Sequence, residues 1–254
     1  MTIFDNQIHS PILTADWPPE DTVFRVSSID LRVRPDDHPF HLAQKAAAEA
    51  NWILERQAKP ALFDGPMVFQ DRLSIRDGAI RGEGCIVPYS TFLWWRRQPA
   101  ATGGFHVFGL PVPVSSDGAV IAIRMAEHTA NPGKVYCPAG SFDPSDVVDG
   151  RCDVLGNMVR EVREETGLDL NAAVADQHYH AVHHHRKMAI LRCFRFALTA
   201  REMLTRIAAH MEVDEEKEIA GAVAIFDADP AAHAYSADMP PMLDWFFNQR
   251  QHGN

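Results

Sequence analysis

Apolar residues follow two different periods along the first hundred residues, and each period predicts a different kind of element. Alternation at every second position is typical of a strand, whereas apolar positions three and four apart are typical of a helix. These patterns predict a strand over 24–33, a helix over 38–57, a hairpin over 71–87 turning at Asp77-Gly78, and a short helix over 90–96. Residues 1–22 have no period and are expected to form an irregular arm.

The pattern becomes denser from Phe105 onward, with strands and helices in closer succession. Asp153 is a good N-cap for the main helix and Gly167 is well suited to end it. Thr199 and Glu202 have the spacing of a capping box, which predicts a second helix. The predicted elements are strands over 105–114 and 119–124, a short strand over 134–140, a helix after 153, a hairpin over 178–197, a helix over 199–210, a strand over 219–226 and a final helix over 239–249.

The pattern of apolar and polar residues changes at Gly103-Gly104, which divides the chain into two unequal parts. Its 254 residues allow one large domain or two unequal ones. We therefore predict an N-terminal extension over 1–102, made of the arm, a strand, a helix and a β-hairpin. A main domain is predicted over 103–254, and the fold class is α+β.

Charge and cysteine content narrow the classes of function. The formal net charge is −10 and no dense run of lysine or arginine occurs, which argues against a nucleic-acid partner. The four cysteines lack the C-x-x-C spacing of a zinc site, so reduced thiols are expected. No signal peptide or membrane-spanning run is expected either, and a cytoplasmic location is predicted.

The main helix carries a run of acidic residues that can do chemistry. Glu161, Glu164 and Glu165 are three and four positions apart, so they project from one side of the helix as a cluster of like charges. A hard divalent cation such as Mg²⁺ would relieve their repulsion. The plainer interpretation is a solvated helix face, on which Arg160 and Glu164 form an ordinary ion pair.

The stretch Arg160-Glu161-Val162-Arg163-Glu164-Glu165-Thr166-Gly167-Leu168, together with the order of elements around it, resembles the Nudix hydrolase family. It looks like the second half of the family's signature, while the first half departs from the pattern. Counting back from Arg160 puts Cys152 where the family has a glutamate, which indicates an insertion within 143–151. Asp146, Asp149 or Asp153 could replace the absent glutamate, or nothing does.

The resemblance implies an α/β/α sandwich with a mixed sheet, preceded by the N-terminal extension. It also implies metal-dependent hydrolysis of the pyrophosphate linkage of a nucleoside diphosphate derivative, with Mg²⁺ or Mn²⁺ as cofactor. The metal ligands carried over are Glu161, Glu164, Glu165 and the backbone carbonyl of Gly140. Among these Glu164 is also a catalytic candidate, with Arg160 orienting a glutamate. A general base is expected among Glu212, Asp214, Glu215, Glu216 and Glu218, with Glu218 preferred because a strand follows it directly.

Several alternatives stay open at this point. Segments of the N-terminal part, such as 52–60 and 63–66, are similar to Nudix proteins of the UDP-glucose pyrophosphatase type, which favours a nucleotide sugar or an ADP-ribose-like substrate. The interrupted signature also fits a Nudix-fold nucleotide-binding or regulatory module with little catalysis. The five histidines within 178–185 allow a zinc site as a weaker hypothesis. The family resemblance is compatible with a homodimer.

Overall fold

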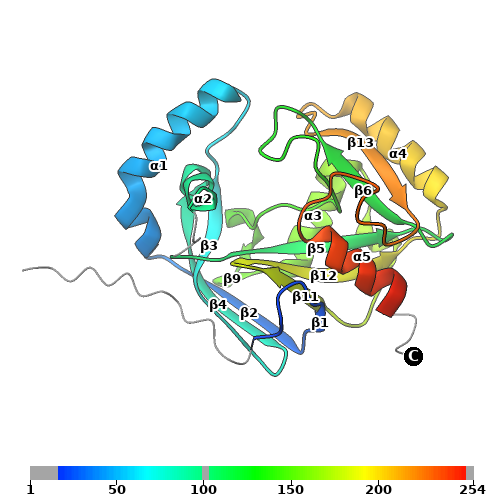
Figure 1. Cartoon of the computed structure of the whole chain (residues 1–254), viewed down its shortest axis with the longest axis horizontal. Helices are drawn as coiled ribbons and strands as arrows, with labels where there is room; N and C mark the ends of the chain where they lie inside the picture. The colour runs from blue at the N-terminus through cyan, green and yellow to red at the C-terminus, as the bar shows by residue number, and fades with distance from the viewer. Residues whose placement is uncertain (1–16, 99–102, 250–254) are drawn as a thin grey trace, which may run out of the picture.

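The computed structural model describes residues 17–98 and 103–249, in which two mixed sheets share one molecule (Figure 1). Most of the predicted irregular arm lies outside the described residues. The larger sheet has the order β1-β11-β12-β5-β6-β13, with β10 beside β12 and β7 beside β6. Its strands are β1 (Phe24–Arg25), β5 (His106–Val114), β6 (Val120–Met125), β7 (Val135–Tyr136), β10 (Val174–Ala175), β11 (His180–His184), β12 (Lys187–Arg195) and β13 (Ile219–Ile225).

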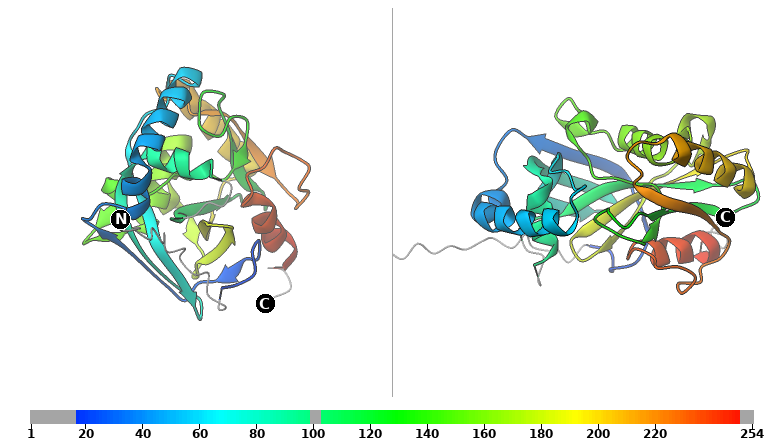
Figure 2. Two further views of the ribbon diagram at one scale, coloured as in Figure 1. Left: turned by 60° about the vertical axis from the view of Figure 1, so that its left-hand side comes forward. Right: turned by 90° about the horizontal axis from the view of Figure 1, so that it is seen from above.

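Helices cover both faces of the larger sheet. The first face packs against α3 (Val154–Thr166) and α4 (Ala200–Val213), and the second packs against α5 (Met239–Asp244) and the π-helical turn Trp245–Gln249. Figure 2 shows α3 and α4 on one side of the sheet and α5 on the other. The predicted α+β class and the α/β/α sandwich with a mixed sheet are therefore confirmed.

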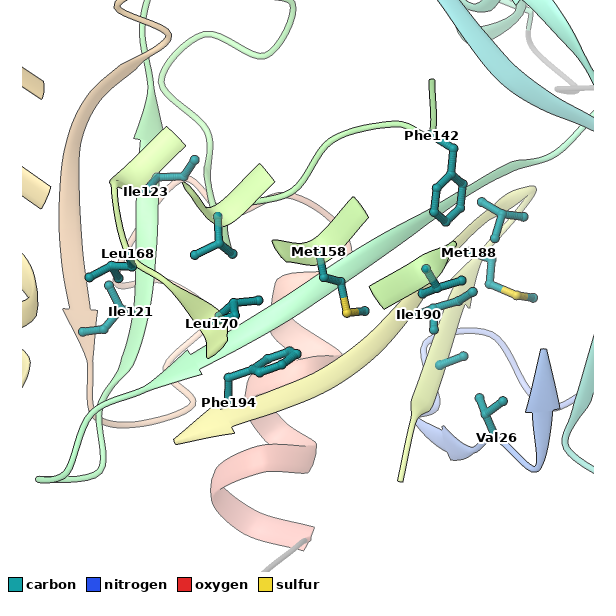
Figure 3. Packing of buried hydrophobic residues seen from close by; sticks show 14 of the residues in the cluster. Val26, Ile121, Ile123, Phe142, Met158, Leu168, Leu170, Met188, Ile190 and Phe194 are labelled. Atoms are coloured by element: carbon teal, nitrogen blue, oxygen red, sulfur yellow. The ribbon is translucent and has the colours of Figure 1, made fainter. Parts of the chain in front are cut away.

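Alternation along each strand explains how one sheet supplies two cores. On β5, Val107 belongs to the core under α3 and α4, whereas its neighbour Phe108 belongs to the core under α5. Met158 of α3 is fully buried against the first face, close to Ile190 and Phe194 of β12 (Figure 3). This packing fixes the position of α3, and with it the position of the acidic residues on the helix.

The smaller sheet holds most of the N-terminal part and has the order β3-β4-β2-β9-β8. Helices α1 and α2 pack against each other beside it. The bounds are β2 (Ser28–Arg34), α1 (Pro39–Ala58), β3 (Pro66–Arg76), β4 (Ala79–Pro88), α2 (Tyr89–Arg96), the 3₁₀ turn Pro144–Asp146, β8 (Val147–Val148), β9 (Arg151–Cys152) and the 3₁₀ turn Leu170–Ala172.

Each part of the chain contributes strands to the sheet of the other part, which the sequence patterns did not predict. The prediction of one strand over 24–33 was wrong, because β1 pairs with β11 of the larger sheet and β2 pairs with β4 of the smaller one. The segment with the expected insertion within 143–151 forms the β8–β9 hairpin, which joins the edge of β2. Residues 99–102 lie outside the described residues, and the boundary after residue 102 stays a prediction.

Candidate active site

Local signals in the sequence fix both ends of α3. The Asp153 side chain accepts a hydrogen bond from the backbone N–H of Gly156 at 2.9 Å, which caps the first turn. Gly167 ends the helix with φ of 68°, a left-handed conformation that favours glycine. Val154, Met158 and Val162 face the core and Glu165 is buried with them, whereas Glu164 lies on the exposed side of the helix. The predicted helix and both of its caps are confirmed.

The three glutamates of α3 differ in their exposure to solvent. The Glu164 side chain is 57% exposed, whereas that of Glu161 is only 12% exposed. Glu165 is buried, and its Oε2 atom has no hydrogen-bond partner in the described part of the chain. The glutamates therefore run from the surface into the protein, which an ordinary solvated helix face does not do.

Arg160 connects the acidic groups of the site. Its Nη2 atom lies 2.8 Å from Glu161 Oε1, and its Nη1 atom lies 2.8 Å from Glu164 Oε2. The same guanidinium also donates to both carboxylate oxygens of Asp146, from Nε at 3.2 Å and from Nη2 at 2.8 Å. Partial burial lowers the pKa of Arg160, but the hydrogen bond to Asp146 and the charge of Glu161 outweigh this effect. The pKa of Arg160 is therefore raised above its ordinary value. Arg160 is thus a fixed cation among carboxylates.

Asp146 is the acid of the interrupted segment that reaches Arg160. It is 4% exposed and also accepts hydrogen bonds from Asn157 Nδ2 and from the backbone N–H of Asp143, both at 3.0 Å. Asp149 lies instead at the turn between β8 and β9, where it has φ of 50°, and Asp153 caps α3.

Cys152, the residue that the family spacing puts at the glutamate position, packs against the main core. The sequence named Asp146 only as one of three alternatives, because the choice depends on how the β8–β9 hairpin pairs.

Gly140 lies directly against the carboxylate of Glu161. A Cβ atom built on this glycine would be 2.2 Å from Glu161 Oε1, so no larger residue fits without displacing the carboxylate. The loop is held on both sides: Ser141 bridges to Phe108 of the larger sheet, and the Phe142 carbonyl accepts from the Val68 N–H at 2.8 Å. The structure thus brings together Gly140 and Glu161, as the resemblance implied.

Burial and like charges dominate the electrostatics of the two inner glutamates. Burial raises the pKa of Glu161 to about 8, against the opposing charge of Arg160. Burial, followed by the charges of Glu161 and Glu218, raises the pKa of Glu165 well above its ordinary value. Ionising both groups together is unfavourable without a compensating positive charge.

These residues fit a hard cation in their chemistry, although the side chains do not converge on one point. In the described residues, no three histidine, cysteine, aspartate or glutamate side chains are grouped closely enough to hold a metal ion as they stand. The Glu165 Oε2 atom, the largely buried Glu161 carboxylate and the close approach of Gly140 to it nevertheless offer the oxygen ligands that a hard divalent cation prefers.

The candidates for a general base are placed very differently from one another. Glu218 lies near the inner glutamates, and its charge contributes to the raised pKa of Glu165. Partial burial raises the pKa of Glu218 itself, as do the nearby charges of Glu216, Asp214 and Glu164, while His128 opposes them. Asp214 accepts the backbone N–H groups of Glu216 and Lys217, so it stabilises the turn after α4. The structure records no interaction that links Glu212 or Glu215 to the inner glutamates within its described residues.

The five histidines of β11 and its flanks do not form a common site. Each has a different neighbour: His178 bonds Arg25 at 2.9 Å, His183 bonds the Pro18 carbonyl at 2.7 Å, His184 bonds Asp21 at 3.0 Å, His185 lies 3.4 Å from Glu20, and His180 packs on Trp245 with ring centroids 4.6 Å apart. As they stand, these histidines are not grouped closely enough within the described residues to hold a zinc ion, so the structure gives the weaker zinc hypothesis no support. Most of these contacts hold the segment before β2 on the larger sheet.

Aromatic side chains of α2 and of the C-terminal helical segment could stack on a nucleobase, but most of them are core residues. Trp95, Trp245 and Phe246 are each at most 8% exposed, and the Trp94 indole donates to Gln44 at 3.2 Å. Sequence reasoning missed Tyr136 instead, which lies on β7 four residues before Gly140. Its pKa is raised by burial and then by the charge of Glu165, which places its hydroxyl near the inner glutamates. The strand pattern over 134–140 was the available signal.

The outer edge of the site is open. A cavity of about 670 Å³ lies over the exposed side of α3, with Arg160, Arg163 and Glu164 among its lining residues. Glu161 and Glu165 are not among its lining residues. Separately, no helix among the described residues has both the length and the apolar character needed to span a bilayer.

Comparisons with known proteins place this chain far from characterised sequences. No family model matches it, and no curated protein matches it. Solved structures of similar fold do exist, and several of them are Nudix proteins.

Three of these structures illustrate the distance. The MutT protein from Methanosarcina mazei Go1 is 16% identical, with a TM-score of 0.38, and the match covers 59% of this chain and 96% of that one. DR0079 from Deinococcus radiodurans is 12% identical, with a TM-score of 0.39 and coverage of 56% and 83%. The Nudix domain of Shewanella oneidensis NrtR, solved with ADP ribose, is 13% identical, with a TM-score of 0.37 and coverage of 62% and 94%. At this distance the matches carry no information about activity, which has to come from the residues of the site.

Proposed function

We propose that this chain is a Nudix pyrophosphohydrolase, which hydrolyses the pyrophosphate linkage of a nucleoside diphosphate derivative with the help of Mg²⁺ or Mn²⁺. One observation carries the proposal. The run Arg160–Leu168 lies on a capped helix with Glu161 against Gly140 and with a buried, unpartnered oxygen on Glu165. An acidic helix without a cation would have little reason to bury these carboxylates.

The residues that would hold the cation are Glu161, Glu164, Glu165 and the backbone carbonyl of Gly140. These are the oxygen ligands that Mg²⁺ prefers. When bound, the cation neutralises phosphate charge and makes a water molecule more acidic. It would also remove the repulsion that raises the pKa values of Glu161 and Glu165.

The remaining residues position and move protons. Arg160 holds Glu161 and Glu164 at 2.8 Å each and is itself held by Asp146, so the carboxylates keep their directions. Glu218 is the proposed general base, since its raised pKa brings it closer to neutral pH and it lies near the inner glutamates. Asp146 takes the positioning role of the glutamate that the spacing lacks.

Within this class we prefer a nucleotide sugar such as UDP-glucose, or an ADP-ribose-like compound. The preference rests on the likeness of the N-terminal segments to UDP-glucose pyrophosphatases of the Nudix type. Both candidates carry a pyrophosphate between a nucleoside and a sugar.

The test is a panel of UDP-glucose, ADP-ribose, NADH, dinucleoside polyphosphates and coenzyme A, assayed for product with Mg²⁺ or Mn²⁺. We expect metal-dependent turnover of at least one compound and its loss in Glu164→Gln. Turnover that is unchanged by Glu164→Gln would contradict the proposed site. Tight nucleotide binding without metal and without product would favour the binding or regulatory module instead.

A further inference from the structure

Arg96 is an exposed arginine beside the acidic site, and its partners among the described residues are all uncharged. It is the last residue of α2, and its Nη2 atom donates to Asn131 Oδ1 at 2.9 Å. The same guanidinium lies 5.7 Å from the centre of the Phe92 ring, and its charge lowers the pKa of the Tyr89 hydroxyl against the larger effect of burial. Among the described residues it forms no ion pair with a carboxylate, whereas its neighbour Arg97 pairs with Glu55 at 2.7 Å.

The residues that contact Arg96 lie close to the proposed catalytic glutamates. Asn131 donates from Nδ2 to the Tyr136 hydroxyl at 3.5 Å. The charge of Glu165 contributes to the raised pKa of Tyr136, and that of Glu218 to the raised pKa of Tyr89, in each case after burial. A chain of neutral hydrogen-bonding groups thus runs from the end of α2 to the proposed metal site.

Further contacts hold this chain in place from both parts of the molecule. Lys59, just after α1, donates to the carbonyl of Thr129, in the same loop as Asn131. The Ala126 N–H at the start of that loop donates to the Glu218 carbonyl at 2.8 Å. The loop 126–133 therefore connects the N-terminal helices with the segment that carries the proposed base.

We propose that Arg96, together with Asn131, binds a phosphate oxygen of the substrate, so that the N-terminal part completes the substrate site. This inference rests on the proposed function, because it assumes a phosphorylated substrate over the glutamates of α3. The guanidinium would exchange or share its bond to Asn131 with the phosphate. The Tyr89 and Tyr136 hydroxyls would donate to the adjoining oxygens or sugar hydroxyls.

Charge is the main reason for assigning a phosphate to this place. The chain has a net charge of −10 and gathers Glu161, Glu164, Glu165 and Glu218 near the site, so an anionic substrate needs positive charge beyond that of a metal. Arginine suits phosphate because its planar fork can donate two parallel hydrogen bonds. Arg160 cannot serve, since carboxylates already occupy its guanidinium.

The experiment compares Arg96→Gln and Arg96→Lys with the matched control Arg97→Gln, one position further along the chain. For the compounds turned over by the wild type, we expect Arg96→Gln to raise KM by about tenfold or more and to change kcat much less, because a binding contact is lost. Arg96→Lys should recover part of the loss, since it restores the charge without the fork. Arg97→Gln should stay within about twofold of the wild type, because its exposed ion pair is worth little.

Calorimetric titration of UDP-glucose and ADP-ribose into the same proteins with Mg²⁺ separates the two proposals. If the wild type binds either compound but hydrolyses no compound of the panel, the proposed function fails, and weaker binding by Arg96→Gln alone still supports the role of Arg96. If Arg96→Gln matches the wild type in KM or in affinity, the assignment of Arg96 is overturned while the proposed function stands. A wild type that neither binds nor hydrolyses any compound of the panel overturns both.

Discussion

Two segments meet at Arg160, and they are positioned by interactions of very different range. The helix segment Arg160–Leu168 depends on a cap at Asp153, a left-handed glycine at Gly167 and a stripe of buried residues, all within one helix. The inserted segment 143–152 delivers Asp146 to the same arginine. It is held by β9 against β2, where Arg151 bonds Asp30 across 121 residues of sequence.

The difference shows a route by which the N-terminal part can influence the proposed catalytic helix. β2 lies between β4 and β9, so the β8–β9 hairpin is an extension of the N-terminal sheet. The end of that extension is bound to Arg160, which in turn holds Glu161 and Glu164. The inserted segment and the helix segment should therefore respond differently to mutation. A mutation in the helix segment should remove a proposed metal ligand, whereas a mutation in the inserted segment should only make the orientation of the ligands less fixed.

The largest effect is expected from the helix segment itself. Glu161→Gln should lower metal-dependent hydrolysis by about a hundredfold or more, because it removes a proposed ligand charge next to Gly140. The fold should persist, since a neutral amide replaces a carboxylate whose charged form is disfavoured by burial. Steady-state kinetics across a Mg²⁺ titration measures the first effect and circular dichroism checks the second.

The matched control for this variant is Glu215→Gln, an exposed acid after α4. It makes the same chemical change outside the proposed site and should leave the rate within about twofold. Equal losses in both variants would show that general charge, and not the position of Glu161, sets the activity.

A mutation of Asp146 in the inserted segment should reduce activity less than Glu161→Gln does. Asp146→Asn keeps the shape but weakens two charge-assisted hydrogen bonds to Arg160, so we expect a loss of about 10- to 100-fold in kcat, the range found for residues that orient metal ligands. The rate is to be followed as a function of Mg²⁺, since poorly oriented glutamates should also need more metal for half-maximal activity.

Asp149→Asn is the control in the same hairpin. Asp149 has φ of 50° at the exposed turn, a conformation that asparagine also tolerates. Full activity in this variant together with reduced activity in Asp146→Asn would assign the effect to the contact with Arg160. Full activity in both would mean that nothing replaces the glutamate missing from the signature.

The range of these interactions also explains what could be predicted from the sequence. Helix α3, its caps, the Asp77-Gly78 hairpin and the capping box of α4 all depend on residues within a few positions of each other, and all are confirmed. The split of 24–33 into β1 and β2 was missed because both strands alternate in the same way. Only their partners, which come from distant parts of the chain, distinguish them.

The same limit applies to the site. The acidic run and the close approach of Gly140 follow from the spacing of a known signature. The choice of Asp146 over Asp149 and Asp153 required the pairing of β8 with β9 and of β9 with β2. Arg96 was likewise beyond reach, because no local pattern connects the end of α2 with Asn131 in a loop of the other part.

The smallest effect is expected where the insertion joins the N-terminal sheet. Asp30 is bonded by both Arg32 and Arg151, and although partial burial raises its pKa, these two arginines outweigh it and leave the pKa lowered. Asp30→Asn should reduce the free energy of unfolding by only about 0–1 kcal/mol, since the pairs are largely exposed to solvent. If the position of the hairpin affects that of Arg160, activity should also fall by about two- to fivefold, which corresponds to a change in free energy of the same size.

The control is Asp36→Asn, which removes a comparable exposed pair with Arg34 that does not contact the insertion. If both variants lose stability alike but only Asp30→Asn loses activity, the hairpin positions the site; if neither loses activity, Asp146 is held by its own contacts and the N-terminal sheet only supports it.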